Sequence, residues 1–131
     1  MAVAGLPDLV WVVRRFVRAH SGRSREAAVD IDLMTTELFA NTLRHSRSGE
    51  PGGEVLVVVS KSPRTTQVKL TDQGPRAGTL PHIRSVDVES GEGEDGGFGL
   101  RLVDEFASRW GVVHESERTT VWFELDRSTD R

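Results

Sequence analysis

The chain of 131 residues has the length of one domain, has a formal net charge of −3 from 17 basic and 20 acidic residues, and contains no cysteine. The acidic surplus argues against a dedicated nucleic-acid binder, and the lack of tyrosine argues against a stacking platform for single strands. Without cysteine there is no disulfide framework, which suits a reducing, cytoplasmic compartment. No apolar run is long enough for a membrane span, and residues 1–7 lack the pattern of a secretory signal.

The first third of the chain predicts two helices. Residues 8–19 repeat apolar side chains at helical spacing, with Trp11 interpreted as a core residue and the arginines as a solvated face. Gly22 suits the end of this helix, because a helix often ends at a glycine. Ser24 can then cap a second helix, from about Arg25 to His45.

The remainder predicts two strand pairs separated by a segment without periodicity. The four predicted strands are residues 54–60, 65–71, 110–115 and 119–125. A helix from Leu100 to about Ser108 precedes the second pair, and the Gly- and acid-rich segment at about 76–96 is either a flexible loop or a functional lid. We expect an α+β fold, a two-layer α/β sandwich in which three helices cover one face of a mostly antiparallel sheet.

The second helix concentrates polar groups beside an apolar stripe. Asn41, Arg44 and His45 follow Glu37 at helical spacings, so an acid, an amide, a guanidinium and an imidazole project close together. The stripe beside them consists of Leu33, Met34, Leu38 and Leu43. Taken alone, this pattern favours a surface helix with an ordinary Glu–Arg pair, and two later stretches reverse that interpretation.

The later stretches are Asp72-Gln73-Gly74, at a strand end, and Gly96-Gly97-Phe98-Gly99, before a helix. Glycines at such points let backbone N–H groups approach a ligand, and a helix N-terminus favours an anion. Each stretch alone more often marks a turn, and no Gly-Lys-Ser/Thr follows, which excludes a Walker loop.

In this order, the three stretches resemble the N, G1 and G2 boxes of the GHKL (Bergerat-fold) ATPases. Within that superfamily the chain is similar to the small anti-sigma-factor serine kinases of bacteria, the RsbW-like group, over roughly residues 8–125. The resemblance implies one ATP-binding kinase domain over residues 1–131, with a lid at about 76–96.

The resemblance also implies a role for each matching residue. Asn41 would hold Mg²⁺, and Glu37 would be the catalytic base for the attacking hydroxyl. Asp72 would accept a hydrogen bond from the adenine amine, a contact that selects adenine over guanine. The other ATP contacts would come from Arg44, Gly74, Gly97, Gly99, Leu100 and Thr120. A surface ion pair for Arg44 and a satisfied strand threonine for Thr120 are equally weighted alternatives.

The function implied by the resemblance is that of an anti-sigma factor. Such a protein sequesters a sigma factor and uses ATP to phosphorylate a Ser or Thr of a STAS-domain anti-anti-sigma factor. A homodimer is implied too, with no direct nucleic-acid or membrane partner. The alternative is a non-catalytic nucleotide-binding or partner-sequestering module of the same fold. A histidine-kinase catalytic domain ranks last, because no phosphoacceptor helix is visible.

Three features depart from the family pattern, and one of them is the short, acidic lid, which would repel triphosphate unless Mg²⁺ is present. Arg76 stands where the G1 box usually has a second glycine, which slightly favours the non-catalytic alternative. Residues 1–6 are short and interrupted by Gly5, so we expect no N-terminal strand and an open sheet edge that invites pairing with another chain.

Overall fold

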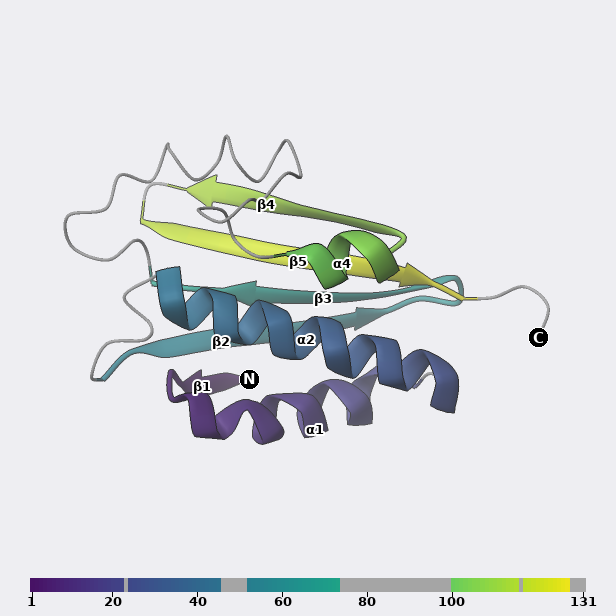
Figure 1. Ribbon diagram of the computed structural model, residues 1–131, viewed down its shortest axis with the longest axis horizontal. Coiled ribbons are helices and arrows are strands. Elements are labelled where there is room, and N and C mark those ends of the chain that lie inside the picture. The colour runs from purple at the N-terminus through teal and green to yellow at the C-terminus, as the bar shows by residue number, and fades with distance from the viewer. Residues whose placement is uncertain (23, 46–51, 74–99, 116, 128–131) are drawn as a thin grey trace.

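The computed structural model describes residues 1–22, 24–45, 52–73, 100–115 and 117–127. In chain order the elements are β1 (Ala2–Ala4), η1 (Pro7–Leu9), α1 (Val10–Ser21), α2 (Arg25–His45), β2 (Glu54–Lys61), β3 (Thr65–Thr71), α4 (Arg101–Phe106), β4 (Arg109–Glu115) and β5 (Arg118–Asp126). The described strands form one antiparallel sheet in the order β1-β2-β3-β5-β4. The helices α1, α2 and α4 cover one face of it (Figure 1). This is the predicted α+β sandwich.

The core lies between the helices and the inner face of the sheet. Alternation along the strands points one set of side chains toward α1 and α2. The buried sheet residues of this set are Val55, Val57, Val68, Leu70, Val121 and Phe123. The α2 side chains in the same core are Ile31, Met34, Leu38 and Phe39. Each such side chain contributes about 1.5–3 kcal/mol by leaving water, so this contact positions α2 over the sheet.

The N-terminal strand contradicts the expectation of an open edge. β1 pairs with β2, and Val3, opposite Val55, is buried. Met1 extends the pairing, because its ammonium donates to Val57 O at 2.8 Å and its carbonyl accepts from Val57 N at 2.8 Å. The expectation of no N-terminal strand was based on the shortness of the segment and on Gly5. The neighbouring strand β2 satisfies the backbone groups of β1 and buries Val3, and the local sequence does not show this.

The residues at which the helices begin and end agree with the prediction more closely than the predicted sets of buried side chains do. α2 spans the predicted residues, Gly22 ends α1 with a φ of +60°, and Ser24 Oγ accepts from Ala27 N at 3.3 Å. Trp11 is 55% exposed and Leu33 is 42% exposed, so the core interpretation of both side chains is wrong. A helical stripe tells which side chains share a face, but only packing decides how wide a face is buried.

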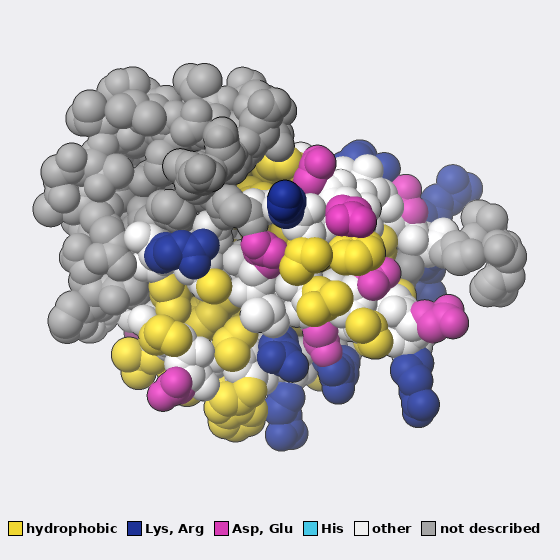
Figure 2. All heavy atoms as spheres, in the orientation of Figure 1, with side chains coloured by type: hydrophobic (Ala, Val, Ile, Leu, Met, Phe, Trp, Pro, Cys, Tyr) yellow, Lys and Arg dark blue, Asp and Glu magenta, His cyan; other side chains and the backbone are white. Residues whose placement is uncertain are grey.

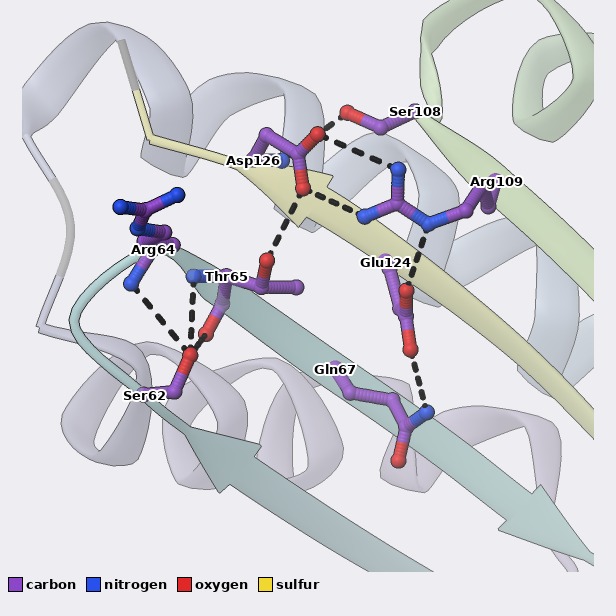
Figure 3. Close-up of polar contacts among 8 residues, drawn as sticks. All are labelled: Ser62, Arg64, Thr65, Gln67, Ser108, Arg109, Glu124 and Asp126. Carbon is purple, nitrogen blue, oxygen red and sulfur yellow. Dashed lines mark hydrogen bonds and ion pairs between the residues drawn. The ribbon is translucent and has the colours of Figure 1, made fainter. Parts of the chain in front are cut away.

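The outer face of the sheet has a polar network that joins three strands (Figure 3). Arg109 Nε donates to Glu124 Oε1 at 2.8 Å, and Gln67 Nε2 donates to Glu124 Oε2 at 2.8 Å. Asp126 accepts from the Arg109 guanidinium and from Thr65 Oγ1. These hydrogen bonds, to Asp126 first and then to Glu124, raise the pKa of Arg109 above its usual value. The network therefore fastens β4, β5 and β3 on the side away from the helices.

No helix among the described residues is long and apolar enough to cross a bilayer.

Candidate functional site

Three chain segments that carry polar side chains meet at one end of the sandwich. The C-terminal end of α2, the end of β3, and the hairpin ends of β4 and β5 lie together there (Figure 1). Glu37, Asn41 and Arg44 lie on the last turns of α2, and Asp72 directly follows β3. The alternation that buries Leu70 also places Asp72 on the inner face, toward the helices.

Asp72 is held in place by the neighbouring strand. Its carboxylate Oδ1 accepts from Thr119 N at 3.0 Å, and its own backbone N donates to Thr119 O at 2.9 Å. The residue is only 8% exposed. A carboxylate fixed in this way, at the edge of the core, can accept a hydrogen bond from a planar ligand with little loss of side-chain entropy.

Of the two adjacent threonines, the structure brings Thr119 and not Thr120 to Asp72. Thr119 is buried on the inner face, and its Oγ1 lies 3.2 Å from His114 Nδ1. Thr120 lies on the outer face, where its Oγ1 and Thr71 Oγ1 are 2.8 Å apart. The geometry of Thr120 is therefore that of the alternative interpretation, a satisfied strand threonine.

Sequence reasoning missed Thr119 and His114, although a signal for Thr119 was present. Val121 and Phe123 are apolar at alternate positions, and the same period puts Thr119 with them on the inner face. For His114 no such signal existed, because its neighbour across the strands depends on the register of β4 and β5. That register pairs His114 with Thr119.

Asn41 is the most deeply buried of the three predicted site residues on α2, which are Glu37, Asn41 and Arg44. It is 1% exposed, and its Oδ1 accepts from Arg44 Nη2 at 3.3 Å. Its Nδ2 has no hydrogen-bond partner within the described part of the chain. An unsatisfied buried amide group costs about 1–3 kcal/mol, so a ligand atom that accepts from Asn41 Nδ2 would stabilise this end of the molecule.

Glu37 lies one helical turn before Asn41 and is half-buried. Desolvation raises the pKa of its carboxyl above the ordinary 4.5, and the Arg44 guanidinium partly opposes this effect. A carboxylate with a raised pKa is a stronger base than one in water. Glu37 is thus suited to accept a proton from a hydroxyl held next to it.

The residues at this end fit a magnesium-bound phosphate better than a protein-enclosed metal. The described residues offer no group of three or more His, Cys, Asp or Glu side chains that could hold a metal ion. Mg²⁺ commonly uses one or two protein oxygens and takes the rest from phosphate and water. One amide oxygen from Asn41 is sufficient for such an ion.

The other predicted site residues are distributed unevenly over the described structure. Leu100 is buried directly before α4. Gly74, Gly97 and Gly99 lie outside the described residues, as do Arg76 and the predicted lid at about 76–96.

A family model for the histidine kinase-like ATPase domain matches residues 3–125. The chain belongs to this family. A comparison with curated proteins gives no match. Membership confirms the GHKL part of the resemblance, and it implies ATP binding, usually with Mg²⁺. For a histidine kinase-like ATPase domain, the cluster of Glu37, Asn41 and Asp72 is the candidate nucleotide site.

Proposed function

We propose that the protein is an ATP-dependent serine/threonine protein kinase that acts as an anti-sigma factor. The observation that carries the kinase part is the pair on α2. Asn41 is buried with an amide nitrogen that no described residue satisfies, and Glu37, one turn away, has a raised pKa. Such a pair would set an amide, which can hold a phosphate oxygen through its nitrogen or Mg²⁺ through its oxygen, beside a group for activating a hydroxyl.

The adenine end of the proposed site would be formed by the end of the sheet. Asp72 would accept from the exocyclic amine of adenine, since its carboxylate is fixed by Thr119 N. Thr119 lies against the same carboxylate and would support the base in place of Thr120. Guanine offers a carbonyl oxygen where adenine has its amine, so the contact with Asp72 would reject GTP.

At the phosphate end, each residue of α2 would have a separate task. Asn41 would hold Mg²⁺, which when bound neutralises charge on the phosphate oxygens. Glu37 would accept the proton of the attacking Ser or Thr hydroxyl. Arg44, now 3.3 Å from Asn41 Oδ1, would turn to the phosphates, where a guanidinium suits anionic oxygens.

The partners in this proposal come from the sequence resemblance alone. The protein would sequester a sigma factor in the cytoplasm and, as a homodimer, phosphorylate a STAS-domain anti-anti-sigma factor. The added phosphate would bring charge of about −1.5 to −2 to that interface and break it. Release of the antagonist would leave the protein able to hold the sigma factor again.

A non-catalytic nucleotide-binding module is the second candidate, and one observation favours it. Asn41 Oδ1, the oxygen that would bind Mg²⁺, accepts from the Arg44 guanidinium. If Arg44 keeps this position when nucleotide binds, its positive charge would compete with the metal. Such a protein would bind ATP without transferring phosphate and act by sequestering its partner.

Calorimetric titration of ATP and GTP, each with and without Mg²⁺, tests the proposal. We expect Mg²⁺-dependent ATP binding that is lost in Asn41→Ala and Asp72→Ala, and no GTP binding. A γ-phosphate transfer assay with candidate STAS-domain substrates then separates the two candidates, because only a kinase transfers. ATP binding without transfer to any candidate substrate supports the second. Failure to bind ATP at millimolar concentration would exclude the kinase and leave a partner-sequestering module of the same fold.

A further inference from the structure

A hollow lies against α2 on the side of α1, and it shares Arg44 with the group of Glu37 and Asn41. It has a volume of 410 Å³. Its lining consists of Gly5, Pro7, Val10, Thr36, Phe39, Ala40, Leu43 and Arg44. Thr36, Ala40 and Leu43 follow one another at helical spacing, so they form a continuous strip of α2. We name this hollow, between the segment 5–10 and the C-terminal half of α2, the α1–α2 groove.

The α1–α2 groove continues into an exposed apolar surface. Leu6 and Trp11, which neighbour the lining residues Pro7 and Val10, are each 55% exposed. Figure 2 shows hydrophobic side chains gathered over the start of α1 and the C-terminal half of α2. Large apolar side chains that surround a hollow in this way are typical of protein–protein interfaces, in which tryptophan is enriched.

Basic side chains border this apolar surface (Figure 2). Arg14 and Arg15 follow Val10 and Trp11 by one helical turn, and neither forms an ion pair with any described residue. Arg18, one turn further along α1, is paired with Asp32. Asp8 is the acidic residue nearest in sequence to the groove lining on α1. With Arg14, Arg15 and Asp8, the border therefore has a small basic surplus on a chain with a net charge of −3.

We propose that the α1–α2 groove binds an amphipathic helix with acidic flanks, supplied by a partner protein. A helix presents apolar side chains at i, i+3, i+4 and i+7. These side chains span about 10 Å, the same rise that separates Thr36 from Leu43 on α2. Its acidic flanks would meet Arg14 and Arg15. The proposal builds on the proposed function, since this would be the surface that holds a sequestered protein, but docking does not require nucleotide.

The test uses fluorescently labelled peptides of about 18 residues, or five helical turns. One peptide has leucine at the i, i+3, i+4, i+7 positions and glutamate on both flanks. A second has lysine in place of the glutamates, and a third has the composition of the first in scrambled order. We expect the acidic peptide to bind at least about tenfold more tightly than either control, a difference of about 1.4 kcal/mol. Added salt should weaken it.

A matched pair of variants locates the binding surface. Ala40 lies in the groove, whereas Ala19 is an exposed alanine near the far end of α1. Ala40→Glu should fill the groove and repel the acidic peptide, with a loss of at least about tenfold in affinity. Ala19→Glu adds the same charge to a helix outside the groove and should leave the affinity unchanged. Circular dichroism confirms that both variants fold.

Several outcomes would overturn the docking proposal. Equal binding of the acidic and scrambled peptides would do so, as would absence of binding or equal loss in both variants. If Ala40→Glu instead converts a dimer to a monomer in sedimentation, the occupant is a second copy of this chain. ATP titration of the same samples keeps the two proposals apart. Peptide binding without ATP binding would support the docking proposal and exclude the kinase. ATP binding without peptide binding would overturn the docking proposal and leave the kinase proposal standing.

Discussion

The polar side chains on the two sides of the sheet differ in whether their hydrogen-bonding groups are satisfied. On the outer face, Arg109, Glu124 and Gln67 satisfy one another. On the helix-covered side, Asn41 has a buried amide nitrogen without a partner among the described residues. A satisfied polar network stabilises a structure, whereas an orphaned buried group costs free energy unless a ligand completes it. A ligand at this end would satisfy Asn41, whereas the outer-face network is satisfied by its own residues.

Glu37→Gln should produce the largest effect. The amide keeps the size of the side chain but cannot accept a proton, so phosphoryl transfer should fall by about 10²–10⁴-fold. ATP affinity should stay nearly constant. The assay is γ-phosphate transfer to a STAS-domain substrate, with calorimetry on the same sample.

Glu124→Gln on the outer face is the matched control and should transfer at the rate of the original chain. Equal activity of the two variants would remove Glu37 from the role of base.

Asp72→Asn should have the next largest effect, on nucleotide selection. An amide can still accept from Thr119 N, but it would then present its NH₂ to the adenine amine, so two donors would face each other. Loss of one charge-assisted hydrogen bond predicts about a 10–100-fold weaker Kd for ATP by calorimetry. Asp126→Asn provides the comparison on the outer face, and a similar loss there would contradict the assignment.

The adjacent threonines allow the sharpest comparison of the two faces. Thr119→Val removes a hydroxyl on the inner face, and Thr120→Val removes one on the outer face. We expect the first to weaken ATP binding by up to about tenfold, the value of one neutral hydrogen bond, and the second to leave it unchanged. If titration shows a larger loss of ATP affinity for Thr120→Val than for Thr119→Val, Thr120 would again be the proposed adenine contact.

The smallest expected effect is a pH dependence of stability. The folded-state pKa of Glu37 is raised from 4.5 by desolvation, so the folded protein binds this proton more tightly than the unfolded chain. The free energy of unfolding therefore falls as pH rises from 4.5 through the folded pKa. Glu37→Gln should lack this decline and be the more stable protein at neutral pH. Urea unfolding of both proteins from acid to neutral pH measures the difference, and parallel curves would contradict it.

Local patterns in the sequence predicted the elements but not all of their neighbours. The alternation of Val68 and Leu70 and the cap at Ser24 are local, and both predictions are confirmed. β1 was missed because its stability depends on Val55 and Val57, more than fifty residues away. The choice between Thr119 and Thr120 likewise depended on strand alternation relative to Asp72. The exposure of Trp11 depended on how α1 packs, which no periodicity gives.

The order of strands has a consequence for how the protein acquires its site. β2 with β3 and β4 with β5 are local hairpins, whereas β3 and β5 pair across 49 positions, from Thr71 to Thr120. Contacts between distant residues form slowly because a long loop must first be closed. The contact between Asp72 and Thr119 belongs to this long-range pairing. A ligand bound there would therefore stabilise the fully folded protein by mass action. A partly folded molecule with the two hairpins but without the β3–β5 pairing would lack this binding site.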